Sequence, residues 1–173
     1  RYTRLEGTAT ARRLDYAFAA LAAWLGASHD SVAAARRRRL DPEFDSLRPD
    51  QQLEVLWFDG VRAAARRDRN GLDAARARLH DLLVASQLGD SLHWAPDQSL
   101  AAFSLALEGR PEEAGRRLAA LEWTIADTFP FHRKGWGPTR WSLGIHRLAA
   151  SRWLAAAGDT AQPIRLLRWV DNW

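Results

Sequence analysis

The sequence of 173 residues contains no cysteine and no methionine, and Lys134 is its only lysine. Without cysteine the chain has no disulfide, no thiolate metal site and no thiol nucleophile. Cysteine usage therefore gives no information on whether the protein works in an oxidising or a reducing compartment. No apolar run approaches the roughly 18 residues of a membrane-spanning helix. Because methionine is absent and the chain starts at Arg1, we expect a processed or excised piece of a longer protein. Localisation is therefore unknown, with the cytoplasm slightly favoured and export as the alternative.

The residues that are abundant favour α-helices around a hydrophobic core. Hydrophobic residues make up 47% of the chain, which is enough apolar surface to offset the entropy of ordering. Alanine and leucine dominate this share, and both are strong helix formers, whereas the β-branched residues typical of strands are few. No segment alternates apolar and polar residues between hairpin turns. The sequence therefore predicts an all-α fold without a sheet.

Prolines and cap residues mark the expected helix starts. Pro49, Pro96, Pro111 and Pro138 each stand ahead of an apolar-periodic run, where a first-turn proline costs no hydrogen bond. Further cap residues lie at Asn70–Asp73 and at 158–160. On the first helix, five apolar residues share one face at helical spacing, namely Leu14, Phe18, Leu21, Ala22 and Leu25. These signals predict eight helices at 8–27, 30–40, 49–69, 71–86, 96–108, 111–128, 138–157 and 160–172.

Consecutive helices joined by short turns predict four antiparallel hairpins, at about 8–40, 49–86, 96–129 and 138–173. A small residue is expected in each helix where the two helices of a hairpin cross, because small side chains let two helix axes approach closely. In three hairpins these residues are alanines 12 positions apart. In the fourth hairpin, the residue 12 positions after Ser151 is Pro163, which departs from the pattern. The small residues are Ala22, Ala34, Ala63, Ala75, Ala102, Ala114 and Ser151.

With these crossings and the Gly-x-x-x-x-Ala step from Gly109 to Ala114, the chain resembles a tetratricopeptide-repeat (TPR) or TPR-like α-solenoid protein. Its units are longer than the standard repeat of about 34 residues. The resemblance implies one helical-repeat domain over 1–173, folded as a short right-handed α-solenoid. In bacterial proteins, such segments are often attached to a signalling, transcriptional or export module.

Residues with the spacing of a catalytic or metal site are missing. The five histidines form neither an HExxH motif nor an i, i+4 pair. Capping and solvation explain the carboxylate neighbours Glu112–Glu113 and Glu54 with Asp59, and the arginine run 36–39 is interpreted as a solvated helix end. We therefore predict no catalytic residue, no metal, no cofactor and no enzymatic activity.

Aromatic and cationic residues gather near the C-terminal end instead. Of the nine tryptophans, six lie from Trp123 onward. The loop 129–137 and the end 166–173 combine tryptophan, phenylalanine and arginine, which dominate binding hot spots. The candidate partner contacts are Phe131, Arg133, Trp136, Arg140, Trp169 and Trp173. The alternative interpretation is a loop that plugs the gap between two hairpins.

These observations predict a non-catalytic protein-protein interaction scaffold or assembly subunit, whose partner is another protein or a neighbouring subunit. A nucleic-acid-binding helical repeat that uses its arginines is an alternative. With 25 basic and 21 acidic residues and a net charge of +4, the chain is only mildly basic for that role. A ligand-sensing regulatory helical domain is a second alternative, and a membrane-peripheral role of the Trp-rich end is a third.

Overall fold

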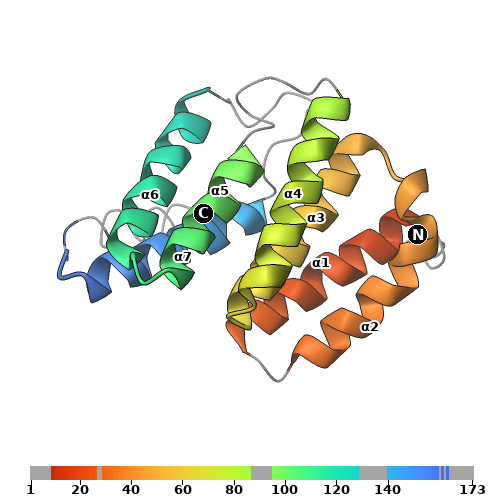
Figure 1. The fold of residues 1–173 in the computed structure, drawn as a ribbon, viewed down its shortest axis with the longest axis horizontal. Helices are drawn as coiled ribbons and strands as arrows, with labels where there is room; N and C mark the ends of the chain where they lie inside the picture. The colour runs from red at the N-terminus through yellow and green to blue at the C-terminus, as the bar shows by residue number, and fades with distance from the viewer. Residues whose placement is uncertain are drawn as a thin grey trace, which may run out of the picture. The chain divides into compact units, whose positions relative to one another are not determined.

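The computed structural model describes residues 9–26, 29–86, 95–128 and 140–159, together with 161 and 163. All regular structure in these residues is helical, so the all-α prediction is confirmed for the described part of the chain (Figure 1). The chain divides into two compact units, 1–88 and 89–173. The elements are α1 (Ala9–Leu25), α2 (Asp30–Leu40), the 3-10 helix η2 (Asp41–Ser46), α3 (Pro49–Ala65), α4 (Arg69–Ala85), α5 (Ala95–Leu107), α6 (Pro111–Thr128) and α7 (Arg140–Ala156).

The predicted helix ranges agree well with these bounds. The predictions 30–40 and 111–128 coincide with α2 and α6. Two differences are informative: α3 ends at Ala65 rather than at 69, and η2 was not predicted. The helix predicted at 160–172 lies outside the described residues, apart from 161 and 163.

A left-handed glycine closes both α5 and α7. At the end of α5, Gly109 has a φ of +80° and donates its N–H to the Ala106 carbonyl at 3.2 Å. The next N–H, of Arg110, reaches back to the Leu105 carbonyl at 3.0 Å, which completes a Schellman motif. The same two bonds follow α7 around Gly158, whose φ is +88°. Glycine adopts this conformation without the clash that a Cβ brings.

The end of α3 has the same motif without a glycine. Arg67 occupies the left-handed position with a φ of +55°, and the Asp68 N–H donates to the Ala63 carbonyl at 2.9 Å. Asp68 then caps α4 by accepting the Gly71 N–H at 2.9 Å. The sequence prediction placed this cap too late, at Asn70, because an arginine in the left-handed position does not mark a turn.

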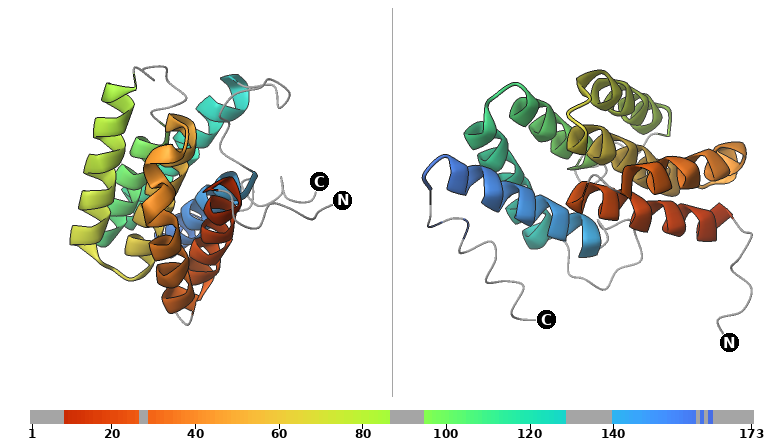
Figure 2. Two further views of the ribbon diagram at one scale, coloured as in Figure 1. Left: turned by 90° about the vertical axis from the view of Figure 1, so that its right-hand side faces the viewer. Right: turned by 90° about the horizontal axis from the view of Figure 1, so that it is seen from below.

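Unit 1 contains α1 to α4. Helices α1 and α2 lie side by side and run antiparallel, α3 packs on α1, and α4 returns along α3 (Figures 1 and 2). Most of the core comes from α3, where Trp57 and Phe58 meet edge to face at 4.9 Å. The largest fully buried side chains of the unit are Tyr16, Leu40, Leu53, Val55, Leu56, Leu72, Leu79 and Leu83.

Unit 2 contains α5, α6 and α7. Helix α6 packs against both α5 and α7, and the rings of Phe103 and Trp153 join α5 to α7 edge to face at 5.3 Å. Helices α6 and α7 approach closely at Gly115: a Cβ on this residue would lie 2.8 Å from Leu154 Cγ and 3.3 Å from the Ala150 carbonyl oxygen. This glycine therefore sets the spacing of the two helices.

Helix α1 buries three alanines and Tyr16, whereas three of its other large apolar residues are exposed. An amphipathic helix usually turns its apolar stripe to the core. Here Leu14, Phe18 and Leu25 are 38%, 53% and 65% exposed, and Leu21 and Ala22 are half-buried. The buried face consists of Tyr16, Ala17, Ala20 and Ala23. We call Leu14 and Leu25, which lie on one face of α1, the α1 stripe.

Candidate functional site

Most of the partner contacts predicted from sequence lie outside the described residues. This holds for five of them, Phe131, Arg133, Trp136, Trp169 and Trp173. The sixth, Arg140, is the first residue of α7, and the structure describes its backbone. The role of these residues stays a prediction.

The small residues predicted at helix crossings lie mainly inside the two units. Ala63, Ala75, Ala102, Ala114 and Ser151 are buried, whereas Ala22 and Ala34 are half-buried. In the first hairpin, the neighbours Ala20, Ala23 and Ala33 are more deeply buried. Their pairing across each crossing stays a prediction.

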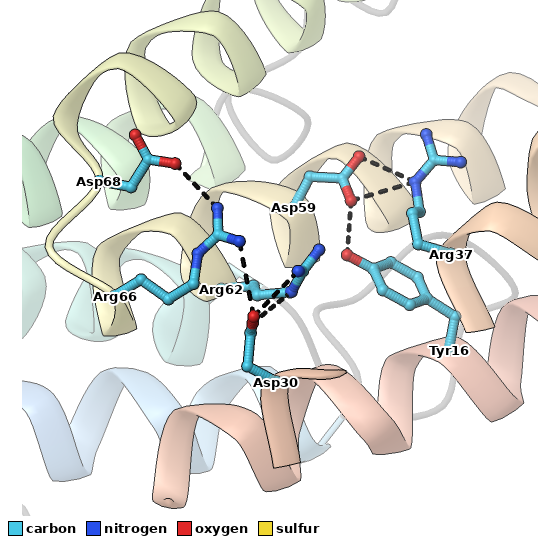
Figure 3. Close-up of polar contacts among 7 residues, drawn as sticks. All are labelled: Tyr16, Asp30, Arg37, Asp59, Arg62, Arg66 and Asp68. Carbon is cyan, nitrogen blue, oxygen red and sulfur yellow. Dashed lines mark hydrogen bonds and ion pairs between the residues drawn. The ribbon is translucent and has the colours of Figure 1, made fainter. Parts of the chain in front are cut away.

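Arginine and carboxylate side chains form a polar network between α1, α2 and α3 (Figure 3). Its first half centres on Asp59 of α3. The Tyr16 hydroxyl of α1 donates to Asp59 Oδ1 at 2.5 Å, and Arg37 Nε of α2 donates to both oxygens of Asp59 at 3.1 and 3.0 Å. One carboxylate thus joins three helices.

The second half centres on Asp30, the first residue of α2. Arg62 of α3 grips it in a bidentate manner, with Nε at 2.5 Å from Oδ1 and Nη2 at 3.1 Å from Oδ2. Nη1 of Arg66 also lies 3.5 Å from Asp30 Oδ2, and Nη2 of Arg66 donates to Asp68 Oδ2 at 2.8 Å (Figure 3). The network therefore runs from the start of α2 to the cap of α4.

Further ion pairs extend the network along α1. Arg13 pairs with the buried Glu54 of α3, and Arg12 pairs with Glu43 of η2. Glu54 was interpreted from sequence as a capping or solvated carboxylate, and that interpretation is wrong. A carboxylate leaves water at low cost only when a partner compensates its charge, and Arg13 is that partner.

The arginine run 36–39 divides between two environments. Arg36 pairs with Asp15 of α1 at 2.7 Å, and Arg37 reaches Asp59, whereas Arg38 and Arg39 are exposed. The sequence interpretation as a solvated helix end therefore holds for half of the run. Consecutive residues diverge around a helix, so the four arginines form no single patch.

The network shifts the proton affinities of its members. Burial raises the pKa of the Tyr16 phenol well above its ordinary value, and the carboxylate of Asp59 acts in the same direction. The hydrogen bond from Arg62 lowers the pKa of Asp30 and raises the pKa of Arg62. Burial lowers the pKa of Arg13. Tyr16 therefore stays protonated as a donor, and Asp30 stays ionised.

These ion pairs and hydrogen bonds connect α1, α2 and α3, and we call them the structural clamp. Guanidinium groups grip the carboxylates of Asp30, Glu54 and Asp59, which leaves them poorly placed to take a proton from a substrate. Sequence reasoning missed the clamp because its partners lie far apart: 22 positions separate Arg37 from Asp59, and 43 separate Tyr16 from Asp59.

Within the described ranges, no group of three histidine, cysteine, aspartate or glutamate side chains has the geometry to hold a metal ion. No helix in the same part of the chain is both long and apolar enough to cross a membrane. The α1 stripe consists of exposed large apolar side chains on one helix face, and it is a candidate binding feature. Compared with protein-family models, curated proteins and solved structures, the chain matches none of them.

Proposed function

We propose that the protein is a non-catalytic protein-protein interaction scaffold or assembly subunit, built as a TPR-like α-solenoid. Two features support the repeat architecture: α3, α5 and α7 end in the same Schellman turn, and small residues are buried in the helices on either side of the first two turns. A stack of helix hairpins offers a ridged surface suited to docking protein segments.

The observation that carries this proposal is the α1 stripe. Leu14 and Leu25 lie on one helix face, and they are 38% and 65% exposed. Isolated surface leucines are ordinary, but large apolar side chains aligned along one helix face are typical of a contact surface for an apolar partner. A protein supplies such a partner, and we expect the stripe to bind an amphipathic helix or a helical subunit.

The charges favour a protein partner over nucleic acid. Six arginines of unit 1 are already paired with carboxylates of other elements or of the α3–α4 turn, namely Arg12, Arg13, Arg36, Arg37, Arg62 and Arg66. Phosphate binding relies on cations that are available to replace counterions along the backbone. Compensated arginines contribute little to that exchange.

Photo-crosslinking from the stripe tests the proposal. A photoreactive amino acid replaces Leu14 or Leu25 in the full chain, which is expressed in its native host. We expect a crosslink to one discrete second polypeptide, and we expect Leu25→Ser to weaken that association. Val84 of α4 is the control, because it is 62% exposed and no other large apolar residue within α4 is exposed, so the same replacement there should give no such product.

Two results would contradict the proposal. Crosslinks from positions 14 and 25 that stay within the chain would mean that the chain itself covers the stripe. Crosslinks to nucleic acid or lipid, identified by mass spectrometry, would favour a nucleic-acid-binding or membrane-peripheral role instead.

A further inference from the structure

Helix α2 has a small share in the hydrophobic core of unit 1. Among its residues, only Ala33 and Leu40 are buried, whereas α3 buries nine residues, including Leu53, Trp57 and Val61. Because the hydrophobic contribution grows with the apolar area removed from water, apolar packing anchors α2 far less firmly than α3.

Charged contacts hold α2 in place at both ends. At its first residue, Asp30 receives the bidentate contact of Arg62 and a second contact from Arg66. One turn before its end, Arg37 donates to Asp59 (Figure 3). The Arg37 guanidinium also lies 5.9 Å from the centre of the Tyr16 ring, a cation-π distance. Between these contacts Arg36 pairs with Asp15 of α1.

The two main pairs are shielded enough from water to matter. The side chains of Arg37 and Asp59 are 11% and 19% exposed, and those of Arg62 and Asp30 are 14% and 24% exposed. Partly buried pairs interact more strongly and are screened less than surface pairs. When one member of such a pair is removed, the other keeps a charge without compensation. Removing Asp30 or Asp59 should therefore weaken the docking of α2.

We propose that α2 is an electrostatically latched helix, which opens from α1 and α3 as a separate unit while α3 and α4 stay folded. The latch consists of Asp30 with Arg62 and of Arg37 with Asp59. Arg37 also pairs with Asp41 of η2, the segment that directly follows α2, so this pair moves with the helix. Opening uncovers Tyr16, which is fully buried in the closed unit. Unit 1 thus has two states, and a partner that prefers one of them can shift the balance. This inference does not depend on the proposed scaffold function.

Native-state hydrogen exchange on the full chain tests the latch. In the wild type, we expect the amides of 30–40 to be protected at least roughly tenfold less than those of 53–61, with a smaller denaturant dependence, because a local opening exposes less surface. In Asp30→Asn and in Asp59→Asn, protection of 30–40 should fall by roughly another tenfold, the loss expected for a charged hydrogen bond. Protection of 53–61 should change less than about twofold.

Asp73→Asn is the matched control. It removes the exposed i, i+4 partner of Arg69 on α4, and exposed pairs of this kind contribute little. It should leave the exchange of both segments unchanged. The latch is overturned if 30–40 and 53–61 exchange together with the same denaturant dependence in the wild type, a comparison that needs no variant to fold. It is equally overturned if neither substitution at Asp30 or Asp59 lowers the protection of α2.

Discussion

Replacing Gly115 with alanine tests the packing of α6 against α7. In an exposed helix interior, Gly→Ala stabilises by about 1 kcal/mol, because alanine has the higher helix propensity. At Gly115 the added Cβ would lie 2.8 Å from Leu154 Cγ and 3.3 Å from the Ala150 carbonyl oxygen. Leu154 and Ala150 are each 1% exposed, so both contacts lie in the core of unit 2.

The clash should outweigh the propensity gain. Overpacking of a tight core site costs about 1 to 3 kcal/mol. After the gain of about 1 kcal/mol from propensity, we expect Gly115→Ala to lower the free energy of unfolding of unit 2 by about 1 kcal/mol. The measurement is urea denaturation followed by far-ultraviolet circular dichroism, with the two units fitted separately if two transitions appear.

A second substitution reverses the expected sign. Leu154→Ala removes the side-chain atoms nearest to the new Cβ. It costs about 2 to 5 kcal/mol by itself through the cavity that it leaves. In that background Gly115→Ala should stabilise by up to about 1 kcal/mol, because propensity then dominates. Stabilisation by Gly115→Ala in the wild-type background would refute the close approach of α6 and α7.

Three further predictions concern unit 1 and the helix turns. Ala75→Leu should destabilise by about 1 to 3 kcal/mol through overpacking, whereas Ala77→Leu at an exposed position should be nearly neutral; equal losses in thermal denaturation would show that the register of α4 is wrong. Arg67→Gly should stabilise by about 0.5 to 1 kcal/mol, because glycine adopts the left-handed conformation of this residue without strain. Gly109→Ala should destabilise by about 1 kcal/mol for the opposite reason. Urea midpoints that move the other way would contradict the left-handed conformation at these two positions. Burial holds the pKa of Tyr16 above its value in the unfolded chain, so the tyrosine of the unfolded chain ionises first as the pH rises. The free energy of unfolding should therefore fall above about pH 10. Tyr16→Phe should make this fall with pH less steep, and an equally steep fall would exclude Tyr16 as its source.

The helices were predictable because their signals are local. Pro111 with the carboxylates after it marks the start of α6, and Gly109 before it marks the end of α5. The same logic failed where the local signal was absent. Arg67 takes a conformation that glycine normally occupies, and only the packed structure shows the Schellman turn around it.

The polar network was not predictable, because it depends on which helix faces meet. Asp59 looks like a solvated carboxylate in the sequence, and nothing local indicates that Tyr16 and Arg37 converge on it. Each pair can be inferred only once α1, α2 and α3 are placed side by side. The identity of a buried ion pair follows from tertiary register, whereas periodicity reports only that a residue lies on a helix.

Helix α1 shows how the same pattern predicts a helix and leaves open the face that it buries. Two neighbours, α2 and α3, pack on α1. A helix with close neighbours on two sides needs small residues there, and Ala17, Ala20 and Ala23 meet that need. The large apolar residues Leu14 and Leu25 are then left on the remaining face. Apolar side chains kept outside a core in a row are unfavourable in water unless something covers them. The packing demand that α2 and α3 place on α1 is therefore the physical origin of the surface that we propose for a protein partner.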